Sequence, residues 1–533
     1  MIDTLGMPRA LSGAPGTVVD SVTQTLAAAE SGDLHALSVA LLIGTAVLIT
    51  AIAAVRLSTR SGLPSLLIYL GIGLALGNRG FGIDFSDEEL TQVLGYAALV
   101  LILTEGGVTT KWDSIKGSLA PAAALATVGV VVSIAVVAVA AHFVLDMTWN
   151  IALLIGAILA STDAAAVFAV LRRVPLPRRI SGMLEAESGF NDAPVVILVT
   201  AFALQTASSG RLSVGHIVLT VVSELVIGSA IGLAVGWLGG RLMARVAGGS
   251  SALFAIGVVT ISVLAYAAAD VVHASGFIAC YLASLVLGNM GLPHRASVLG
   301  FSTALGWLAQ IGLFVLLGLL ADPAGFPSQL IPALVLGLVL LLVARPLSVI
   351  VATAPFRMGW RAQAFLSWAG LRGAVPVVLA TVPLTVGTEG TEGIFNLVFV
   401  LVIIFTLVQA PTLPWVAHRL GLDNSHHSVD LTLETTAFDD IGAHLIEVSV
   451  GPTSRLSGVQ VYELRLPTGV NVALIVRDGV SFVPKETTPL RRGDQLLVVT
   501  PAAVRAQVEK RLYAVSRGGR LAGWSPSGPP PTT

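Results

Sequence analysis

Six ionisable side chains stand out within long apolar segments of this 533-residue chain, and four of the six are acidic. A charge at membrane depth is costly unless it is paired or reached by water, so such residues are candidates for function. Structural ion pairs alone would not require an excess of buried acids. The set therefore predicts a site that handles cations or protons. The six residues are Glu105, Asp163, Glu187, Asp192, Arg345 and Arg372.

The segment ESGFNDAPVV, which starts at Glu187, places three oxygen-bearing side chains together. On a helix, Ser188 and Asp192 share a face because they are four residues apart, and Asn191 lies alongside. Hydroxyl, amide and carboxylate oxygens suit hard cations. Because burial disfavours the charged form of a carboxyl group, one buried acid can hold either a proton or a cation, which is the minimum needed for exchange. Glu187 points about 100° away and is expected to meet an arginine of another helix.

Two further segments, ILASTDAAAV around Asp163 and SWAGLRGAVPVV around Arg372, are predicted to break in the middle of the membrane. Gly370, Gly373 and Pro376 favour an interruption in the second segment. Each break exposes helix ends of opposite partial charge, which an aspartate and an arginine respectively would neutralise. The two segments are seven spans apart, so they enter the membrane in opposite directions. This arrangement predicts an inverted repeat with its site at the midplane.

The composition requires a membrane protein. Hydrophobic residues make up 55% of the chain, charged residues 11%, and the mean hydropathy is +0.86. Soluble proteins carry about 25% charged residues. Thirteen membrane spans of roughly 20 residues each are predicted. They cover 34–55, 63–79, 90–109, 117–145, 149–171, 181–206, 214–240, 251–269, 273–290, 300–320, 328–352, 362–386 and 392–418.

Lysine and arginine alternate between the predicted loops in the way that the positive-inside rule requires. If the N-terminus lies outside, only Arg79 and Arg211 fall in outer loops. We therefore expect a multi-pass protein of the cytoplasmic (inner) membrane, with its N-terminus outside and its C-terminal domain in the cytoplasm. The inner loops carry Arg56, Arg60, Lys111, Lys116, Arg172, Arg173, Arg178, Arg179, Arg241, Arg245, Arg295, Arg357 and Arg361.

Hydropathy falls after Arg419, and this change defines the predicted domains. Strand-like and helical patterns in 444–513 predict a small α+β domain, and the Pro-rich end of the chain predicts disorder. The predicted organisation is a lead-in (1–33), a transmembrane domain (34–420), a linker (421–443), the α+β domain (444–513) and a disordered tail (514–533).

At these residues the transmembrane domain resembles the NhaP-type monovalent cation:proton antiporters. The motifs are TEGG at 104–107, STDA at 161–164, ESGFNDAP at 187–194, VARP at 343–346 and GLRGAVP at 370–376. The resemblance implies that Asp192 binds cation and proton in turn, and that Asn191, Ser188 and Thr162 assist. It also implies a Glu187–Arg345 pair. Glu105 matches an acid that approaches the site. Many family members have proline where this chain has Ala164, which puts the shape of that break in doubt.

The resemblance has further implications. In having asparagine before the key aspartate, the chain resembles the electroneutral members of the family. The resemblance therefore implies the exchange of one proton per cation. Such members are typically homodimers with an elevator-like movement. Residues 444–512 resemble the C-terminal lobe of RCK/TrkA domains, a combination typical of potassium/proton antiporters, so K⁺ is favoured over Na⁺. The lobe is either a regulator, with a small nucleotide as a possible ligand, or a passive dimerisation module. No G-x-G-x-x-G follows Arg419, so NAD is not expected, and no other cofactor is predicted.

Other classes of function fit less well. A gated cation channel would be expected to carry a TVGYG-type filter, which the sequence lacks. A membrane-anchored sensor would not need buried acids. An enzyme is disfavoured because no nucleophile–base pair or phosphate loop is present, and the histidines have no metal-ligand spacing. The net charge of −1 gives no reason to expect nucleic acid, so the expected partners are K⁺ or Na⁺, H⁺, membrane lipids and a second copy of the chain.

Overall fold

The computed structural model describes most of the chain. The described residues are 38–39, 41–55, 64–83, 85–171, 176–208, 213–246, 250–290, 294–387, 391, 393–422, 431–438, 443–451 and 454–519. The predicted lead-in, 1–33, lies outside them. The chain divides into two units, Met1–Ser61 and Gly62–Thr533. In the first unit the structure describes an apolar helix, Leu41–Val55.

Eight helices among the described residues are long and apolar enough to cross a membrane, and five apolar helices are shorter. Each predicted span overlaps one of these helices, while the number of thirteen crossings stays a prediction. The eight long segments are Glu88–Thr109, Leu119–Leu145, Arg179–Ala207, Val214–Val246, Ser251–Val271, Arg295–Leu320, Pro323–Phe356 and Ile394–Arg419. The short ones are Leu41–Val55, Ser65–Leu76, Trp149–Ile158, Gly276–Asn289 and Ala374–Thr385.

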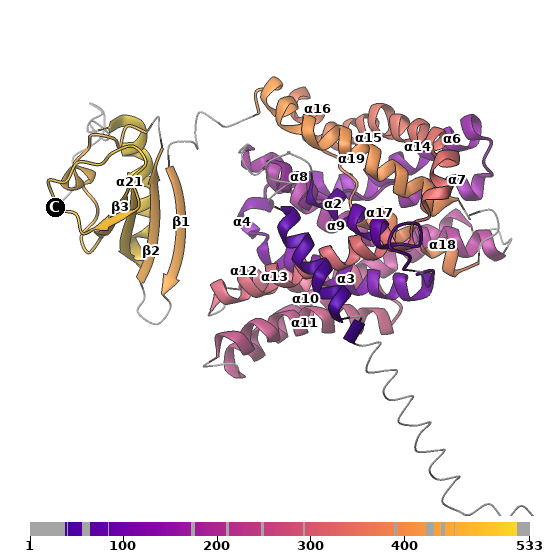
Figure 1. Cartoon of the computed structure of the whole chain (residues 1–533), viewed down its shortest axis with the longest axis horizontal. Coiled ribbons are helices and arrows are strands. Elements are labelled where there is room, and N and C mark those ends of the chain that lie inside the picture. Colours follow the sequence, from indigo (N-terminus) through magenta and orange to yellow (C-terminus); the bar gives the residue numbers. More distant parts are fainter. Residues whose placement is uncertain are drawn as a thin grey trace, which may run out of the picture. The chain divides into compact units, whose positions relative to one another are not determined.

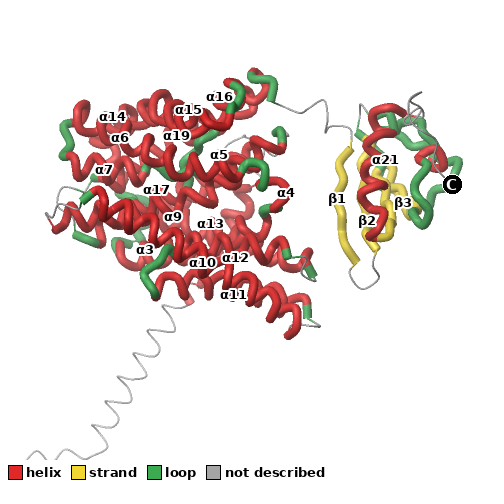
Figure 2. Tube along the Cα trace, turned by 180° about the vertical axis from the view of Figure 1, so that it is seen from behind, coloured by secondary structure: helices red, strands yellow, loops and turns green. Residues whose placement is uncertain are grey.

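Most helices of the second unit are labelled in Figure 1, and α5 is labelled in Figure 2. Their bounds in the first half are α2 Ser65–Leu76, α3 Glu88–Thr109, α4 Trp112–Ile115, α5 Leu119–Ala124, α6 Val130–Leu145, α7 Trp149–Ile158, α8 Ala164–Leu171, α9 Arg178–Ser208 and α10 Val214–Val246. The second half holds α11 Ser251–Val271, α12 Gly276–Asn289, α13 Arg295–Leu320, α14 Phe326–Val339, α15 Arg345–Thr353, α16 Trp360–Trp368, α17 Ala374–Leu379, α18 Val382–Thr385 and α19 Ile394–Arg419.

Both predicted helix breaks are present. The first separates α7 from α8 at residues 159–163, and the second separates α16 from α17 at residues 369–373. The two breaks touch, because the backbone N–H of Asp163 donates to the carbonyl oxygen of Leu371 at 2.9 Å. The first break forms without a proline, because Ala164 is the first residue of α8. The Asp163 carboxylate caps the new helix by accepting a hydrogen bond of 3.1 Å from the Ala166 N–H.

Helix α9 runs between two groups of helices (Figure 2). On one side it packs against α5 and α7. Helix α7 packs against α6, and α6 in turn contacts α14 and α15. On the other side it packs against α12 and α10, which belong with α3, α11 and α13. The residues that start at Glu187 therefore lie inside the bundle, where both groups can contribute to their surroundings.

Helices α10 and α12 approach each other very closely through glycine. A Cβ atom added at Gly228, Gly232 or Gly236 would run into the backbone of α12 at Ser275, Ala279 or Ala283 respectively. Small residues at such positions let two backbones meet in a membrane, where packing rather than hydrophobicity drives association. These two helices form a tightly packed block.

The C-terminal domain is built on an antiparallel five-stranded sheet with the strand order β1-β2-β5-β3-β4. Its strands are β1 Leu431–Phe438, β2 Ala443–Val450, β3 Asn471–Arg477, β4 Val480–Phe482 and β5 Gln495–Pro501, and helix α21 spans Arg505–Gly518. Alternate residues of β2 and β5 are buried in one core with Val508 and Leu512 of α21. The fully buried Asp494 accepts two hydrogen bonds from Arg477, at 2.8 and 2.7 Å, and this carboxylate raises the pKa of Arg477.

The structure extends this domain beyond both of its predicted boundaries. The segment 421–443, predicted to be a linker, contains strand β1, which pairs with β2 over its whole length. Its polar, Thr-rich composition resembles a linker, yet threonine favours strands and β1 satisfies the open edge of β2. The tail predicted from residue 514 starts too early, because α21 continues to Gly518 and buries Val515. Residues 520–533 lie outside the described part.

The packing of α10 on α12 predicts that Gly232→Ala destabilises the protein. The new methyl group would meet Ala279 backbone atoms that cannot move aside, so overpacking should cost about 1–3 kcal/mol. Thermal unfolding of the purified protein in detergent would show a lower melting temperature. Gly300→Ala on α13 is the matched control, because a Cβ there meets nothing within 4 Å. Equal melting temperatures for the two variants would contradict this packing.

Candidate cation and proton site

Asp192 lies in the middle of α9 and is 8% exposed. Its carboxylate accepts a hydrogen bond of 2.6 Å from the hydroxyl of Ser161, which is fully buried in the break between α7 and α8. The break thus supplies a polar partner to the key acid from another part of the chain. Sequence reasoning missed Ser161. The only signal in the sequence is its position at the start of the STDA motif, directly before Thr162 and Asp163.

A cavity of about 500 Å³ opens beside Asp192. Four of its lining residues are acidic, and none of the lining residues in the described part of the chain is lysine or arginine. Such a lining attracts cations from solution. Ser188 and Thr162 also line it, as predicted residues of the site. The acids are Glu105, Asp163, Glu185 and Asp192, of which Glu185 was not singled out from the sequence.

Glu105 enters this cavity from α3. Its carboxylate lies directly over Gly306 of α13, because a Cβ at Gly306 would be 2.6 Å from a Glu105 oxygen. A larger residue at Gly306 would displace the acid. Glu105 therefore belongs to the same cavity as Asp192, although it comes from the other group of helices.

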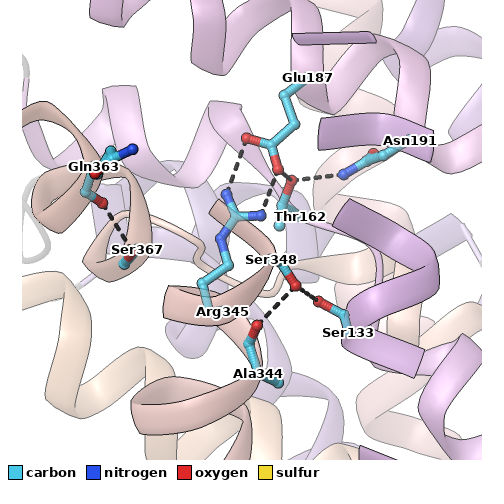
Figure 3. A network of polar contacts seen from close by, with 9 residues as sticks. All are labelled: Ser133, Thr162, Glu187, Asn191, Ala344, Arg345, Ser348, Gln363 and Ser367. Atoms are coloured by element: carbon cyan, nitrogen blue, oxygen red, sulfur yellow. Dashed lines mark hydrogen bonds and ion pairs between the residues drawn. The ribbon is translucent and has the colours of Figure 1, made fainter. Parts of the chain in front are cut away.

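Glu187 and Arg345 form a bidentate ion pair, shown in Figure 3. The two N–H···O distances are 2.6 and 2.9 Å, and the residues are only 2% and 5% exposed. Arg345 follows a π-helical turn, η3 Leu340–Ala344, and precedes Pro346. Proline cannot donate the usual helical hydrogen bond, so the irregular turn fits this position. The contact that was expected between these two residues is present.

Thr162 and Asn191 connect this ion pair to the broken helix (Figure 3). The Asn191 amide donates to the Thr162 hydroxyl at 2.6 Å, and that hydroxyl donates to Glu187 at 3.5 Å. Both side chains are therefore turned towards Glu187 in this structure. The carbonyl oxygen of Asn191 is buried and has no hydrogen-bond partner within the described residues, so it could accept a proton donor or a cation.

Asp163 and Arg372 lie at the crossing of the two breaks. Asp163 caps α8, and its carboxylate lies against Gly373, where any Cβ would collide with it. Arg372 is 3% exposed, and its Nε and Nη1 atoms make no hydrogen bond within the described residues. The expected contact of Asp163 with a helix N-terminus is present. The role of Arg372 beside C-terminal helix ends stays a prediction.

The ion pair predicts that Arg345→Ala lowers stability. Removing one partner leaves Glu187 buried and uncompensated, which costs about 3–5 kcal/mol. Thermal unfolding of the purified variant would measure the loss. The double variant Glu187→Gln/Arg345→Gln is the control, because it removes both charges and should unfold at a higher temperature than Arg345→Ala. A single variant as stable as the wild type would contradict the energetic role of this pair.

Comparison with known proteins agrees with this geometry. A family described as sodium/hydrogen exchanger, transmembrane, matches residues 46–419, and a TrkA-C domain matches residues 445–513. The chain is 33% identical to the K(+)/H(+) antiporter NhaP of Alkalimonas amylolytica, over 88% of this chain and 82% of the relative. It is 34% identical to K(+)/H(+) antiporter NhaP2 of Shewanella oneidensis, over 83% and 78%.

More distant relatives extend the comparison. The Na(+)/H(+) antiporter ApNhaP of Aphanothece halophytica is 26% identical, over 74% of this chain and 77% of its own. The solved structure of the sodium proton antiporter MjNhaP1 from Methanocaldococcus jannaschii superposes with a TM-score of 0.64 at 21% identity, covering 72% of this chain and 99% of that one. That structure shares the helical fold. The chain therefore belongs to the sodium/hydrogen exchanger family and carries a C-terminal TrkA-C domain.

Proposed function

We propose that the protein is a secondary antiporter that exchanges K⁺ for H⁺ at Asp192. The observation that carries this proposal is the setting of that carboxylate, which is held by Ser161 and faces a cavity lined by acids. A cation that enters the cavity meets acidic side chains, Asp192 among them, and no lysine or arginine among the described lining residues. A proton and a cation would then compete for the same oxygen atoms.

The choice of potassium rests on the relatives. Proteins at 33–35% identity over most of the chain are named K(+)/H(+) antiporters. Sodium is the alternative, because a more distant relative is named a Na(+)/H(+) antiporter. The same site would serve either ion, since both are hard monovalent cations that bind oxygen ligands.

The proposed mechanism is alternating access with one proton per cation. The empty, charged site is too costly to cross the low-dielectric barrier, so Asp192 crosses only when it holds a proton or a cation. Asn191 precedes this acid where a second aspartate would add a charge, which favours electroneutral exchange. Thr109 and Thr110, which line the cavity, lie at the C-terminal end of α3, for which the positive-inside rule predicts a cytoplasmic location.

We place the protein in the inner membrane as a homodimer, with its N-terminus outside and the TrkA-C domain in the cytoplasm. The distribution of lysine and arginine supports this orientation. The dimer is proposed from the resemblance to NhaP-type antiporters alone. The TrkA-C domain is proposed to regulate exchange, with a small nucleotide as its candidate ligand.

Asp192→Asn is expected to abolish exchange, because an amide can neither release a proton nor neutralise a cation. Proteoliposomes would be given an inside-acid pH gradient, then K⁺ or Na⁺, while internal pH is followed by fluorescence. Wild-type protein should dissipate the gradient with K⁺. A response to Na⁺ alone would keep the site and change the ion, whereas exchange by the Asp192→Asn variant would refute the site. Current that persists without a proton gradient would indicate a channel.

A chain that ends at Arg419 is expected to retain exchange that depends on Asp192, because all residues of the proposed site precede that position. Its dependence on pH and cation concentration should differ from that of the full chain if the TrkA-C domain regulates transport. The same proteoliposome assay compares both chains, and the Asp192→Asn change in the shortened chain is the control. Identical profiles for the two chains would indicate a passive domain.

A further inference from the structure

One acid in the cavity has no role in the mechanism above. Glu185 lies on α9 seven residues before Asp192, so both face the same side of the helix at a separation of about 10 Å along its axis. Its carboxylate accepts one long hydrogen bond, 3.5 Å from the Ser181 hydroxyl. It forms no ion pair within the described residues. Lys111 acts on this carboxylate from beyond ion-pair distance, so a direct salt bridge does not account for the acid.

Tyr281 of α12 lies at the same part of the cavity. Its ring covers Gly189 of α9 so closely that any Cβ there would collide with it, and it packs edge-to-face on Phe190 with ring centroids 5.6 Å apart. The residue is 2% exposed, and its hydroxyl makes no hydrogen bond of 3.5 Å or less within the described residues, although the Thr110 side chain lies near it. Glu185 lies one helical turn before Gly189, on the face of α9 that this ring covers, and Glu185 and Tyr281 line the same cavity. An unsatisfied buried hydroxyl is unfavourable, so a missing partner in the cavity is expected.

We propose that the Glu185 carboxylate and the Tyr281 hydroxyl form a second binding site for a monovalent cation, which the ion occupies before it reaches Asp192. Both groups offer oxygen atoms to the same cavity, and the lining contains no lysine or arginine among the described residues. The remaining ligands would be water, for which the cavity of about 500 Å³ has room. We call this pair the Glu185 site.

The Glu185 site would raise the local concentration of cations near Asp192. Its occupant stays partly hydrated, because only one carboxylate and one hydroxyl replace water. The site therefore affects how readily the cation reaches Asp192 and leaves the exchange step itself unchanged. This role rests on the proposed antiport, whereas the binding of a cation at Glu185 does not.

Binding can be tested on the purified full-length protein with rubidium-86, or with sodium-22 if sodium is the transported ion. Asp192→Asn protein should retain weak binding, and this binding should disappear in the Asp192→Asn/Glu185→Gln double variant. Asp113→Asn in the Asp192→Asn background is the matched control, since it removes an equally charged but exposed carboxylate. The proposal would be overturned if the Asp192→Asn protein bound no cation, or if the added Glu185→Gln change left its binding unchanged.

Transport gives an independent readout. Glu185→Gln and Tyr281→Phe should each raise the half-saturating cation concentration about 3- to 10-fold, because one ligand of the ion is lost, while the maximal rate is retained. Glu185→Asp should recover part of the affinity. The Glu185→Gln/Tyr281→Phe double variant should be little worse than Glu185→Gln alone, because both groups hold one ion.

A lowered maximal rate with unchanged half-saturation would instead show that Glu185 supports the helix only, and would overturn the site. Failure of the proposed antiport has a different signature, because wild-type proteoliposomes would then respond to neither K⁺ nor Na⁺. In that case the binding measurement on the Asp192→Asn variants still decides whether the Glu185 site exists.

Discussion

The bidentate ion pair between Glu187 and Arg345 is the interaction on which the site depends. Two opposite charges buried among apolar helices are tolerated only because they neutralise each other at 2.6 and 2.9 Å. The pair ties α9 to α15, and the Thr162 hydroxyl extends this connection to the start of α8. Asp192 lies five residues further along α9 and forms no ion pair with Arg345. This arrangement agrees with the proposal that a proton or a cation from the cavity balances Asp192.

The two helix breaks are also polar structures that must be satisfied within an apolar bundle. Each break exposes backbone groups that lipid could not satisfy, so it is possible only where protein or water surrounds it. Here the breaks satisfy each other through the Asp163 N–H and the Leu371 carbonyl, and Asp163 caps the next helix. The same interruption frees Ser161 from regular helix and brings its hydroxyl to Asp192. A local defect in secondary structure thus supplies the polar surroundings that an apolar bundle otherwise lacks.

Features that depend on local sequence could be predicted, and features that depend on distant neighbours could not. The spans, the breaks and the direction of Glu187 follow from periodicity and from glycine and proline, which act locally. Ser161, Glu185 and Tyr281 were not predicted, because their importance depends on neighbours in distant helices. Tyr281 reads as an ordinary buried aromatic until Gly189 is seen beneath it. Strand β1 was missed for a similar reason, since its pairing with β2 stabilises a segment whose composition suggests a linker.

The contacts of α9 differ between its two sides, and this difference bears on the proposed movement. Towards α8 and α15 it is held by charged and hydrogen-bonded groups, Glu187 to Arg345 and Asn191 to Thr162. Towards α12 it presents Gly189 to the Tyr281 ring, a contact that contains no hydrogen bond from the Tyr281 hydroxyl within the described residues.

Breaking the polar contacts would leave buried charges unpaired, whereas a ring can slide over a glycine at little cost. A rearrangement that carries Asp192 from one side of the membrane to the other would therefore keep α8, α9 and α15 together. It would separate them from the tightly packed block of α10 and α12.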